Sequence, residues 1–424
     1  MNKYVCLIVV FIILSCGLPN QEDLKPRILI STDIGGTDPD DNQSILHLLM
    51  YSNMFAIEGL VSSPSYGEGS KTELLKMIDL YEKDLPKLKM HSDDFPLPEH
   101  LRAVTKQGRK GEAPFVGYQK STEGSDWIIH CAKKSSDQPL WVLVWGGLDD
   151  VAQALHDAPE IQNKIKIYWI GGPNKKWSVN SYAYIAENFP DLWIIEANAV
   201  YRGLFSNTQS LDRLKNERYF DSYIDSAGAM GKAFKQYYDG KIKMGDTPSL
   251  LYLLNGEPLN PLTESWGGQF EAIKRSSRRI YNRNTTANDT IPVYSVIEFH
   301  FKGQDVNLPI GAACLEMTVA GQKWPGYYLG RGTYVVRYVP KKAETLTYQI
   351  QSQVSGLSQQ NGQFVVSNLW PGKSSEADYK LGSNWYTDIS DPDLFDDNWQ
   401  GAQTVLKWRR IILLDWAERW QWLK

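Results

Sequence analysis

The sequence predicts an α/β protein with a mostly parallel sheet covered by helices on both faces, joined to an antiparallel β-sandwich. Two observations predict this architecture. From residue 27 to about 281, short apolar runs rich in β-branched residues alternate with amphipathic helical patterns, the order typical of a parallel sheet. From about residue 291 the hydrophobic period changes to two, which is typical of strands with one buried face. The 424 residues are enough to form both units.

Composition restricts the possible partners. With 42% hydrophobic and 22% charged residues the chain is an ordinary globular protein, and its net charge of −4 gives no reason to expect nucleic acid or an anionic membrane as a partner. The 15 Trp and 23 Tyr fit two interpretations, a large aromatic core or faces that stack on sugars. Beyond residue 16 only Cys131 and Cys314 occur, so we do not expect a disulfide framework.

Residues 1–16 have the pattern of a secretion signal. Lys3 precedes the apolar run 5–14, which is too short to span a bilayer, and Ile13-Leu-Ser-Cys16 is similar to a bacterial lipobox. This pattern predicts a lipid anchor on Cys16 and a location in the bacterial cell envelope. The alternative is an ordinary signal peptide that contains Cys16. Residues 17–26 then form a polar tether.

The α/β domain is expected over residues 27–290. Its predicted strands share short apolar runs, and its predicted helices share an apolar face. The strands are expected at 28–30, 57–61, 140–145, 165–170 and 192–196, and the helices at 71–84, 125–134, 151–158 and 181–188.

The β-sandwich, of the immunoglobulin-like kind, is expected over residues 291–380, where 293–301, 334–339 and 345–350 have a period of two. The remaining residues, 381–424, are predicted to form a linker and a final helix. The acidic stretch 388–397 is interpreted as a solvated connection. Helical spacing returns at 401–422, and we expect this helix to pack back on the α/β domain.

The stretch 27–50 carries the strongest functional signal. A buried-strand pattern leads to Asp33, Asp40 and Asp41, with glycines and a proline between them, and a helical pattern follows. The carboxyl end of a strand is where an α/β sheet places its ligands. Three carboxylates in one small space require water or a cation, and a hard cation such as Ca²⁺ prefers oxygen ligands. One alternative is that the aspartates are turn and capping residues. Another is a phosphate-binding loop, but the Lys and Ser/Thr of that motif do not follow the glycines here.

This stretch resembles the amino-terminal Asp-x-Asp-x-Gly-x-Asp-Asp signature of nucleoside hydrolases. The sequence TDIGGTDPDDNQS, residues 32–44, is more similar to a divergent branch, the cellulose-binding, nucleoside-hydrolase-like family. The first aspartate of the parent signature is Ser31 here, and extra residues separate Gly35 from Asp40 and Asp41. The resemblance also implies that a sandwich is inserted before the last helix.

Further stretches carry the same resemblance. Residues 145–155, WGGLDDVAQAL, are similar to the family's Gly-Pro-Leu-Thr-Asn segment, with Asp149 in place of the threonine whose carbonyl binds calcium. Residues 168–174 end in Asn174 and precede the family's sugar-binding loop, where Asn180 matches a sugar-contacting asparagine. Residues 243–252 are similar to a His-Asp-Pro motif, in which Asp246 is the calcium ligand and Gly245 replaces the histidine.

The resemblance implies a calcium-dependent glycosyl hydrolase. Asp33, Asp41 and Asp246 would bind Ca²⁺ with the carbonyl of Asp149, and Asp33 would also accept a proton from the attacking water. A carbohydrate or nucleoside-like substrate would bind through Asp40, Asn174, Asn180 and Trp266. Each of three residues also has a purely structural interpretation: Asp149 as a helix N-cap, Asn180 as a donor to loop backbone groups, and Trp266 as a core residue. The loss of the histidine at Gly245 keeps a second function open, a carbohydrate-binding lipoprotein without turnover.

Overall fold

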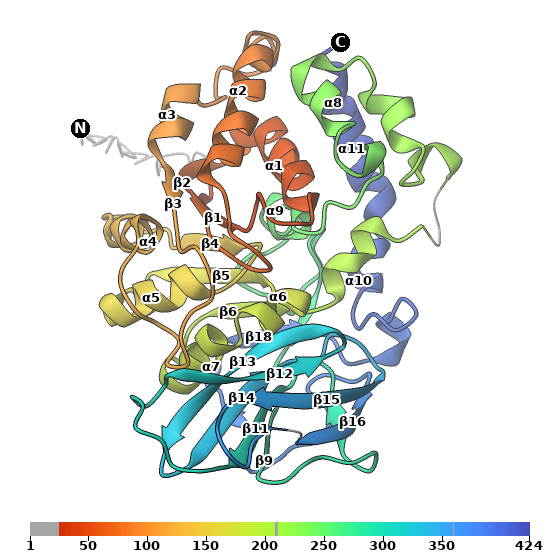
Figure 1. Ribbon diagram of the computed structural model, residues 1–424. Coiled ribbons are helices and arrows are strands. Elements are labelled where there is room, and N and C mark those ends of the chain that lie inside the picture. Colours follow the sequence, from red (N-terminus) through yellow and green to blue (C-terminus); the bar gives the residue numbers. More distant parts are fainter. Residues whose placement is uncertain (1–24, 208–210, 359) are drawn as a thin grey trace, which may run out of the picture.

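The computed structural model describes residues 25–207, 211–358 and 360–424. An α/β body forms one part of the molecule and a β-sandwich the other, and the C-terminal helix lies beside the body (Figure 1). This arrangement confirms the predicted fold class.

The α/β body is built on an eight-stranded sheet with the order β3-β2-β1-β4-β5-β6-β18-β7. All neighbours from β3 to β18 pair in parallel, and only β7 runs antiparallel at one edge. The strands are β1 (Arg27–Thr32), β2 (Ala56–Ser62), β3 (Thr105–Gln107), β4 (Leu140–Val144), β5 (Ile165–Ile170), β6 (Ile194–Ala197), β7 (Phe270–Ala272) and β18 (Trp385–Asp388).

Helices cover both faces of this sheet, because alternate residues of each buried strand point to opposite sides. Ile28 and Ile30 belong to one hydrophobic cluster and Leu29 to the other. The helices of the first face are α1 (Asp40–Met50), α2 (Lys71–Leu88), α3 (Pro98–Ala103), α8 (Gly228–Phe234), α9 (Thr247–Leu254) and α11 (Arg409–Gln421), and those of the second are α4 (Glu123–Lys133), α5 (Asp149–Asp157) and α7 (Val179–Asn188).

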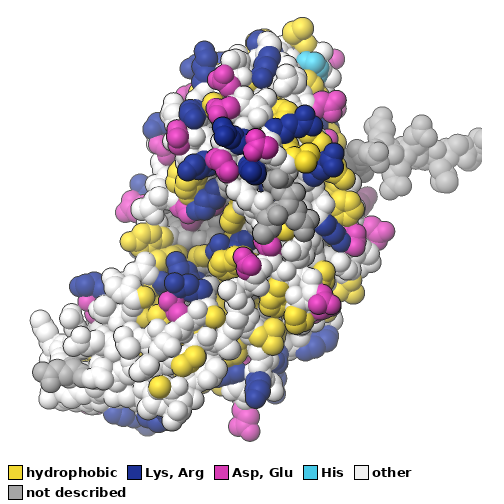
Figure 2. Space-filling view, turned by 90° about the vertical axis from the view of Figure 1, so that its right-hand side faces the viewer, with side chains coloured by type: hydrophobic (Ala, Val, Ile, Leu, Met, Phe, Trp, Pro, Cys, Tyr) yellow, Lys and Arg dark blue, Asp and Glu magenta, His cyan; other side chains and the backbone are white. Residues whose placement is uncertain are grey.

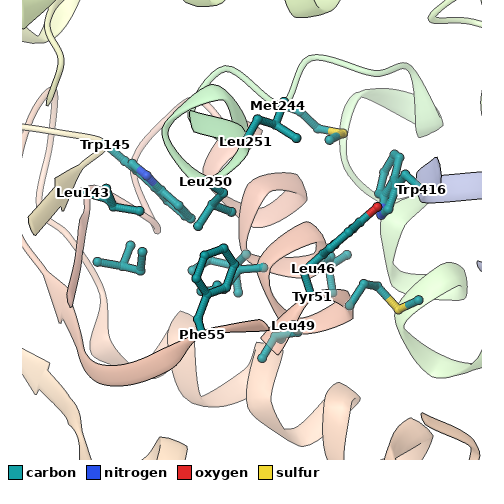
Figure 3. Close-up of a cluster of buried hydrophobic side chains, with 14 of the residues drawn as sticks. Leu46, Leu49, Tyr51, Phe55, Leu143, Trp145, Met244, Leu250, Leu251 and Trp416 are labelled. Carbon is teal, nitrogen blue, oxygen red and sulfur yellow. The ribbon is translucent and has the colours of Figure 1, made fainter. Parts of the chain in front are cut away.

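The core on the first face joins distant parts of the chain. Figure 3 shows Leu46 of α1 together with Leu143 of β4, Leu250 of α9 and Trp416 of α11. All four side chains are at most 1% exposed. Helix α1, which begins with the paired aspartates, is therefore held rigidly between the sheet and the C-terminal helix.

The sandwich is one eight-stranded sheet that folds around its own core, with the order β10-β16-β15-β12-β13-β14-β11-β9. Most neighbours are antiparallel, but β9–β11 and β10–β16 are parallel. Strand β9 starts at Arg278, before the predicted boundary at residue 291. The strands are β9 (Arg278–Tyr281), β10 (Thr290–Pro292), β11 (Val296–Lys302), β12 (Ala313–Val319), β13 (Gln322–Gly330), β14 (Thr333–Tyr338), β15 (Thr345–Ser352) and β16 (Asn361–Ser367).

The segment after the sandwich is more than a linker. It returns to the main sheet as β18, which pairs with β6 and β7. The interpretation of 388–397 as a solvated connection is wrong at its first residue. Asp388 is 1% exposed, and its carboxylate accepts backbone N–H groups of Asn198 and Ala199 at 3.1 and 2.6 Å. These bonds fasten the returning chain to the loop after β6.

The final helices then pack on the α/β body. Helix α10 (Gln403–Leu406) lies against the 3₁₀ segment Val200–Phe205, and Trp416 and Trp420 of α11 are fully buried in the first core. None of the described helices is long and apolar enough to span a membrane. Cys131 and Cys314 are free thiols.

Candidate functional site

The predicted aspartates converge on one pocket at the carboxyl ends of the central strands. Asp33 follows β1, Asp40 and Asp41 are the first residues of α1, and Asp246 immediately precedes α9. All four line a cavity of about 380 Å³. Residues about 200 positions apart in the sequence thus meet at the sheet edge where α/β proteins place their ligands.

Three of these carboxylates form a tight group. One ligand oxygen from each of Asp40, Asp41 and Asp246 lies within 4.8 Å of the others. Asp41 and Asp246 are 3% exposed. Asp41 accepts the Thr32 hydroxyl, and Asp246 accepts the Ser44 hydroxyl at 3.4 Å. Few donors therefore neutralise the buried negative charge.

The pKa values of the four aspartates are raised by burial and by the charges of nearby carboxylates. Burial, followed by the charges of Asp33 and Asp246, raises the pKa of Asp41 well above the ordinary value. The pKa of Asp246 is also raised well above its ordinary value, mainly by burial and next by the charge of Asp40. Asp40 and Asp33 also have raised pKa values, again chiefly because of burial. Without a cation, the charged form of each carboxylate is disfavoured.

Glycines allow the loops to come this close. Gly35 has a φ of 93°, and a Cβ there would lie 2.5 Å from the Cβ of Ser70, so the turn after Asp33 requires glycine. A Cβ at Gly146 would lie 2.7 Å from the Cβ of Asp33. The loop after β4 can therefore lie directly against Asp33.

A hydrogen-bonded chain positions Asp246. The indole of Trp145, at the end of β4, donates to the Ser249 hydroxyl at 2.7 Å. That hydroxyl donates to the backbone carbonyl of Asp246, also at 2.7 Å. The start of α9 is thereby tied to the central strand.

Basic groups also line the pocket. Lys243 forms an ion pair with Asp38, and its Nζ lies 3.9 Å from an oxygen of Asp40. Lys243 accordingly offsets part of the charge on the outer aspartates. Arg202, from the segment Val200–Phe205, and Lys341, from the sandwich, line the same cavity. Figure 2 shows a hollow between the two parts of the molecule, with hydrophobic and basic side chains around it.

Sequence reasoning missed the aromatic wall of the pocket. Tyr66 and Trp177 line the cavity with ring centroids 4.4 Å apart, and Trp177 stacks on Trp324 of β13 at 4.5 Å. These rings come from the loop after β2, the end of α6 (Gly172–Trp177) and the sandwich. The abundance of aromatic residues was the only signal for them.

The side chain of Asp149 lies outside the pocket. This residue is 2% exposed and lies apart from the aspartate group, where its carboxylate accepts the Ala113 N–H at 2.8 Å and the Ser178 hydroxyl at 3.0 Å. Burial, partly offset by these bonds, raises its pKa to about 6. The strand-end residue of this motif that lines the pocket is Trp145. The Asp149 carboxylate therefore takes no part in the candidate metal site, and the role of the Asp149 backbone carbonyl as a calcium ligand stays a prediction.

Two further predicted residues also lie elsewhere. Asn180 is 6% exposed and sits between the body and the sandwich, where it donates to Ala113 O and Tyr327 Oη at 3.1 Å. Trp266 packs against the first core and does not line the pocket. Neither position supports the predicted contact with substrate in this pocket.

Asn174 does line the pocket, but its amide is already engaged. It donates to the carbonyls of Trp145 and Ile170 at 2.8 and 3.0 Å, and accepts the Ser65 hydroxyl at 2.7 Å. Its side chain thus fastens the ends of β4 and β5. Cys16, the predicted lipidation site, lies outside the described residues.

The residues of the pocket fit a calcium ion. The donor set consists of carboxylate oxygens, the ligands that Ca²⁺ prefers, and three of them already lie close together. Two of the three aspartates are almost fully buried with few hydrogen-bond donors, so a cation would relieve their mutual repulsion.

The parallel α/β body with carboxylates at its strand ends is the arrangement expected of a nucleoside-hydrolase-like protein. A family model described as "Cellulose-binding Sde182, nucleoside hydrolase-like domain" matches residues 27–270, more than half of the chain, and the chain belongs to this family. A second model, a domain of unknown function (DUF5060), matches residues 290–353 in the sandwich. No curated protein matches the chain significantly.

Solved structures with a similar fold are distant in sequence. A nucleoside hydrolase-related hypothetical protein from Saccharophagus degradans, associated with carbohydrate metabolism, is 18% identical, with 81% of this chain and 99% of that chain covered and a TM-score of 0.49. An inosine-uridine preferring nucleoside hydrolase from Bacillus anthracis is 17% identical, with 60% and 86% covered and a TM-score of 0.38.

Proposed function

We propose that the protein is a calcium-dependent glycosyl hydrolase that cleaves an N-glycosidic or related bond of a carbohydrate or nucleoside-like substrate. The observation that supports this proposal is the convergence of Asp33, Asp40, Asp41 and Asp246 on one cavity. Family membership supports the same class of chemistry. The aromatic wall offers apolar faces of the kind on which sugar rings stack.

Four aspartates share the metal-binding, proton-accepting and substrate-binding roles in this proposal. Asp40, Asp41 and Asp246 would hold the ion, with Asp33 as a further carboxylate of the same pocket. Bound calcium supplies Lewis acidity that orients a water and lowers its pKa. Asp33, whose pKa is raised by burial, would accept a proton from a water molecule in the pocket. Asp40 is the least buried of the grouped carboxylates and is available to sugar hydroxyls.

The leaving group receives no proton from position 245. Gly245 lines the pocket with backbone only, and a Cβ there would lie 2.7 Å from an Asp40 oxygen. A substrate whose leaving group departs without an acid at this position therefore suits the site better than one that requires protonation.

Thermal unfolding in metal-free buffer, with Ca²⁺ or Mg²⁺ added back, tests the metal site. We expect calcium to raise the Tm more than magnesium does, because binding only to the folded state stabilises by RT ln(1 + [L]/Kd) and magnesium requires a tighter octahedron. Asp41→Ala and Asp246→Ala should abolish the response. Asp93→Ala, at an exposed aspartate in the loop after α2, should preserve it.

Hydrolysis is tested separately, with nucleosides and with plant and algal oligosaccharides as substrates. Asp33→Asn should keep the fold and lose turnover, because an amide cannot accept a proton from water. If calcium changes neither the Tm nor the heat of titration of the unmutated protein, the metal-dependent mechanism is wrong.

A second function, carbohydrate binding without turnover, is favoured by one observation. Tyr66 is 50% exposed at the pocket and stacks with Trp177, a pair suited to binding a sugar face. In this case the unmutated protein and Asp33→Asn should bind the same saccharide equally and neither should hydrolyse it. A turnover that Asp33→Asn removes would exclude this function.

For location we propose a lipid-anchored protein of the bacterial cell envelope, from the sequence of residues 13–16. Mass spectrometry of the mature protein should identify an acylated Cys16 as the first residue. An unmodified mature terminus at another position would contradict the anchor.

A further inference from the structure

Two cations of the pocket have no acidic partner. Arg202 and Lys341 line the cavity, and neither forms an ion pair with a carboxylate of the described residues, whereas Lys243 pairs with Asp38. The Arg202 side chain is half-buried, and its Nε is buried without a hydrogen-bond partner among the residues that the structure describes. A buried donor without a partner is costly, so a ligand that supplies an acceptor would be favoured here.

The guanidinium of Arg202 is held in place by aromatic rings. Its Cζ lies 3.8 Å from the ring centroid of Trp399 and 5.3 Å from that of Tyr201. Trp399 belongs to the segment that returns from the sandwich. Stacking on an aromatic face leaves the edge of a guanidinium free for two parallel hydrogen bonds to a carboxylate or sulfate.

Lys341 brings a second positive charge from the sandwich. Lys341 follows β14 and lines the cavity. Gln322, at the start of β13, lines the same cavity and accepts a hydrogen bond from Lys176. Burial, followed by the charge of Lys341, lowers the pKa of Lys176 to about 8. The two lysines repel each other, and an anion bound between the body and the sandwich would relieve this repulsion.

We infer that the ligand is an acidic saccharide, and that Arg202 and Lys341 bind its carboxylate or sulfate group while Tyr66 and Trp177 contact the sugar ring. This inference rests on the proposed function of the pocket and specifies its substrate class. Lys243 offsets part of the charge of Asp38 and Asp40. The calcium ion of the proposed function would offset two further negative charges, so an acidic ligand can bind on the side of Arg202 and Lys341. The sandwich thus contributes a specificity residue to the pocket of the α/β body.

Calorimetric binding to matched saccharide pairs tests the inference. The full chain carrying Asp33→Asn, in calcium, is titrated with trigalacturonate and its methyl ester, and with a sulfated carrageenan oligosaccharide and its desulfated form. We expect the charged member of one pair to bind at least about tenfold more tightly, as one charge-assisted bidentate contact would provide. Which pair shows this preference distinguishes a carboxylate from a sulfate ligand.

Substitutions then assign the preference to the two cations. Arg202→Met and Lys341→Gln should each reduce the difference within the pair to about twofold, since each removes a charge-assisted contact, and Arg202→Lys should retain more of it. Lys342→Gln is the matched control. Lys342 is the next residue and is also exposed, but it pairs with Glu344 and does not line the cavity. The exposed Lys341 keeps the test interpretable if Arg202→Met unfolds, which circular dichroism would detect.

Equal binding of charged and neutral members, or a preference that survives both substitutions, would overturn the inference. Its failure is distinguishable from that of the proposed function. A calcium-dependent Tm and turnover of a neutral substrate would uphold the hydrolase and reject the acidic saccharide. A charge preference without a calcium response would uphold the acidic saccharide and reject the metal.

Discussion

At the scale of single residues, Asp41 shows the electrostatic cost of grouping carboxylates in a buried site. It is nearly fully buried and close to the charges of Asp33 and Asp246. Among the described residues, the Thr32 hydroxyl donates a hydrogen bond to it. Burial and the neighbouring charges raise its pKa in the folded protein, while in the unfolded chain the group titrates near pH 4. Folding without metal therefore takes up a proton above pH 4, and metal-free stability falls as the pH rises toward the folded pKa.

Asp41→Asn should remove this contribution to the pH dependence, because asparagine does not ionise. In metal-free buffer the Tm of the variant, relative to the unmutated protein, should be higher at pH 7.5 than at pH 4.5. In calcium at pH 7.5 the unmutated protein should instead have the higher Tm, since only it keeps the Asp41 carboxylate as a ligand for the ion. Scanning calorimetry at the two pH values measures the change, and an identical difference at both would show that Asp41 does not titrate on folding.

At the scale of elements, helix α11 shows how distant segments support the site. Trp416 is fully buried between His47 of α1 and Tyr219, with ring centroids at 5.3 and 5.4 Å. Helix α1 starts with Asp40 and Asp41, so the packing of α11 steadies the element that presents them. The C-terminal helix therefore belongs structurally to the α/β body.

Trp416→Ala should lower the free energy of unfolding by about 3–5 kcal/mol, the range for removing a large buried aromatic side chain. Ile411→Ala is the control on the same helix, because Ile411 is 48% exposed, and its effect should be small. Urea unfolding followed by fluorescence and circular dichroism measures both. A small effect of Trp416→Ala would mean that α11 contributes little to the body.

At the scale of the whole molecule, Glu298 connects the sandwich to the α/β body. Its buried carboxylate accepts from Arg278 at 2.8 Å and Arg337 at 2.9 Å, and Arg337 also donates to the carbonyl of Phe115 in the body at 2.8 Å. Burial opposes ionisation, but the hydrogen bond from His300 and the charges of Arg337 and Arg278 together lower the pKa of Glu298 well below its usual range.

Glu298→Ala should cost roughly 3–5 kcal/mol at neutral pH, because it leaves two partly buried arginines without their partner. Since the folded pKa is lowered, this stabilisation is present above about pH 4.5 and is lost as the pH falls toward the folded pKa. Glu316→Ala, which removes a more exposed ion pair with Lys323, is the control and should have little effect. Equal losses in the two variants, by urea unfolding at pH 7, would contradict this view of Glu298.

Much of the fold and the first part of the site could be predicted from local patterns. The strands around Ile28–Ile30 and the helices between them have periodicities that depend only on neighbouring residues. The motif that contains Asp33, Asp40 and Asp41 is equally local. Matching Asp246 to the same site required the family resemblance, because nothing near Asp246 in the sequence indicates a partner about 200 residues away.

Only the tertiary structure decided the rest of the pocket. Strand β18 is short and pairs with residues near Ile194, about 190 positions earlier, a contact that no local period specifies. Asp149 and Asn180 occur in motifs that resemble the family, yet their side chains bond to the neighbouring loop and the sandwich instead. Trp177, which lines the pocket, stacks on Trp324 of the sandwich, so this contact joins rings from the two parts of the molecule. Local sequence determines which elements form, whereas the packing of distant elements determines which side chains share a cavity.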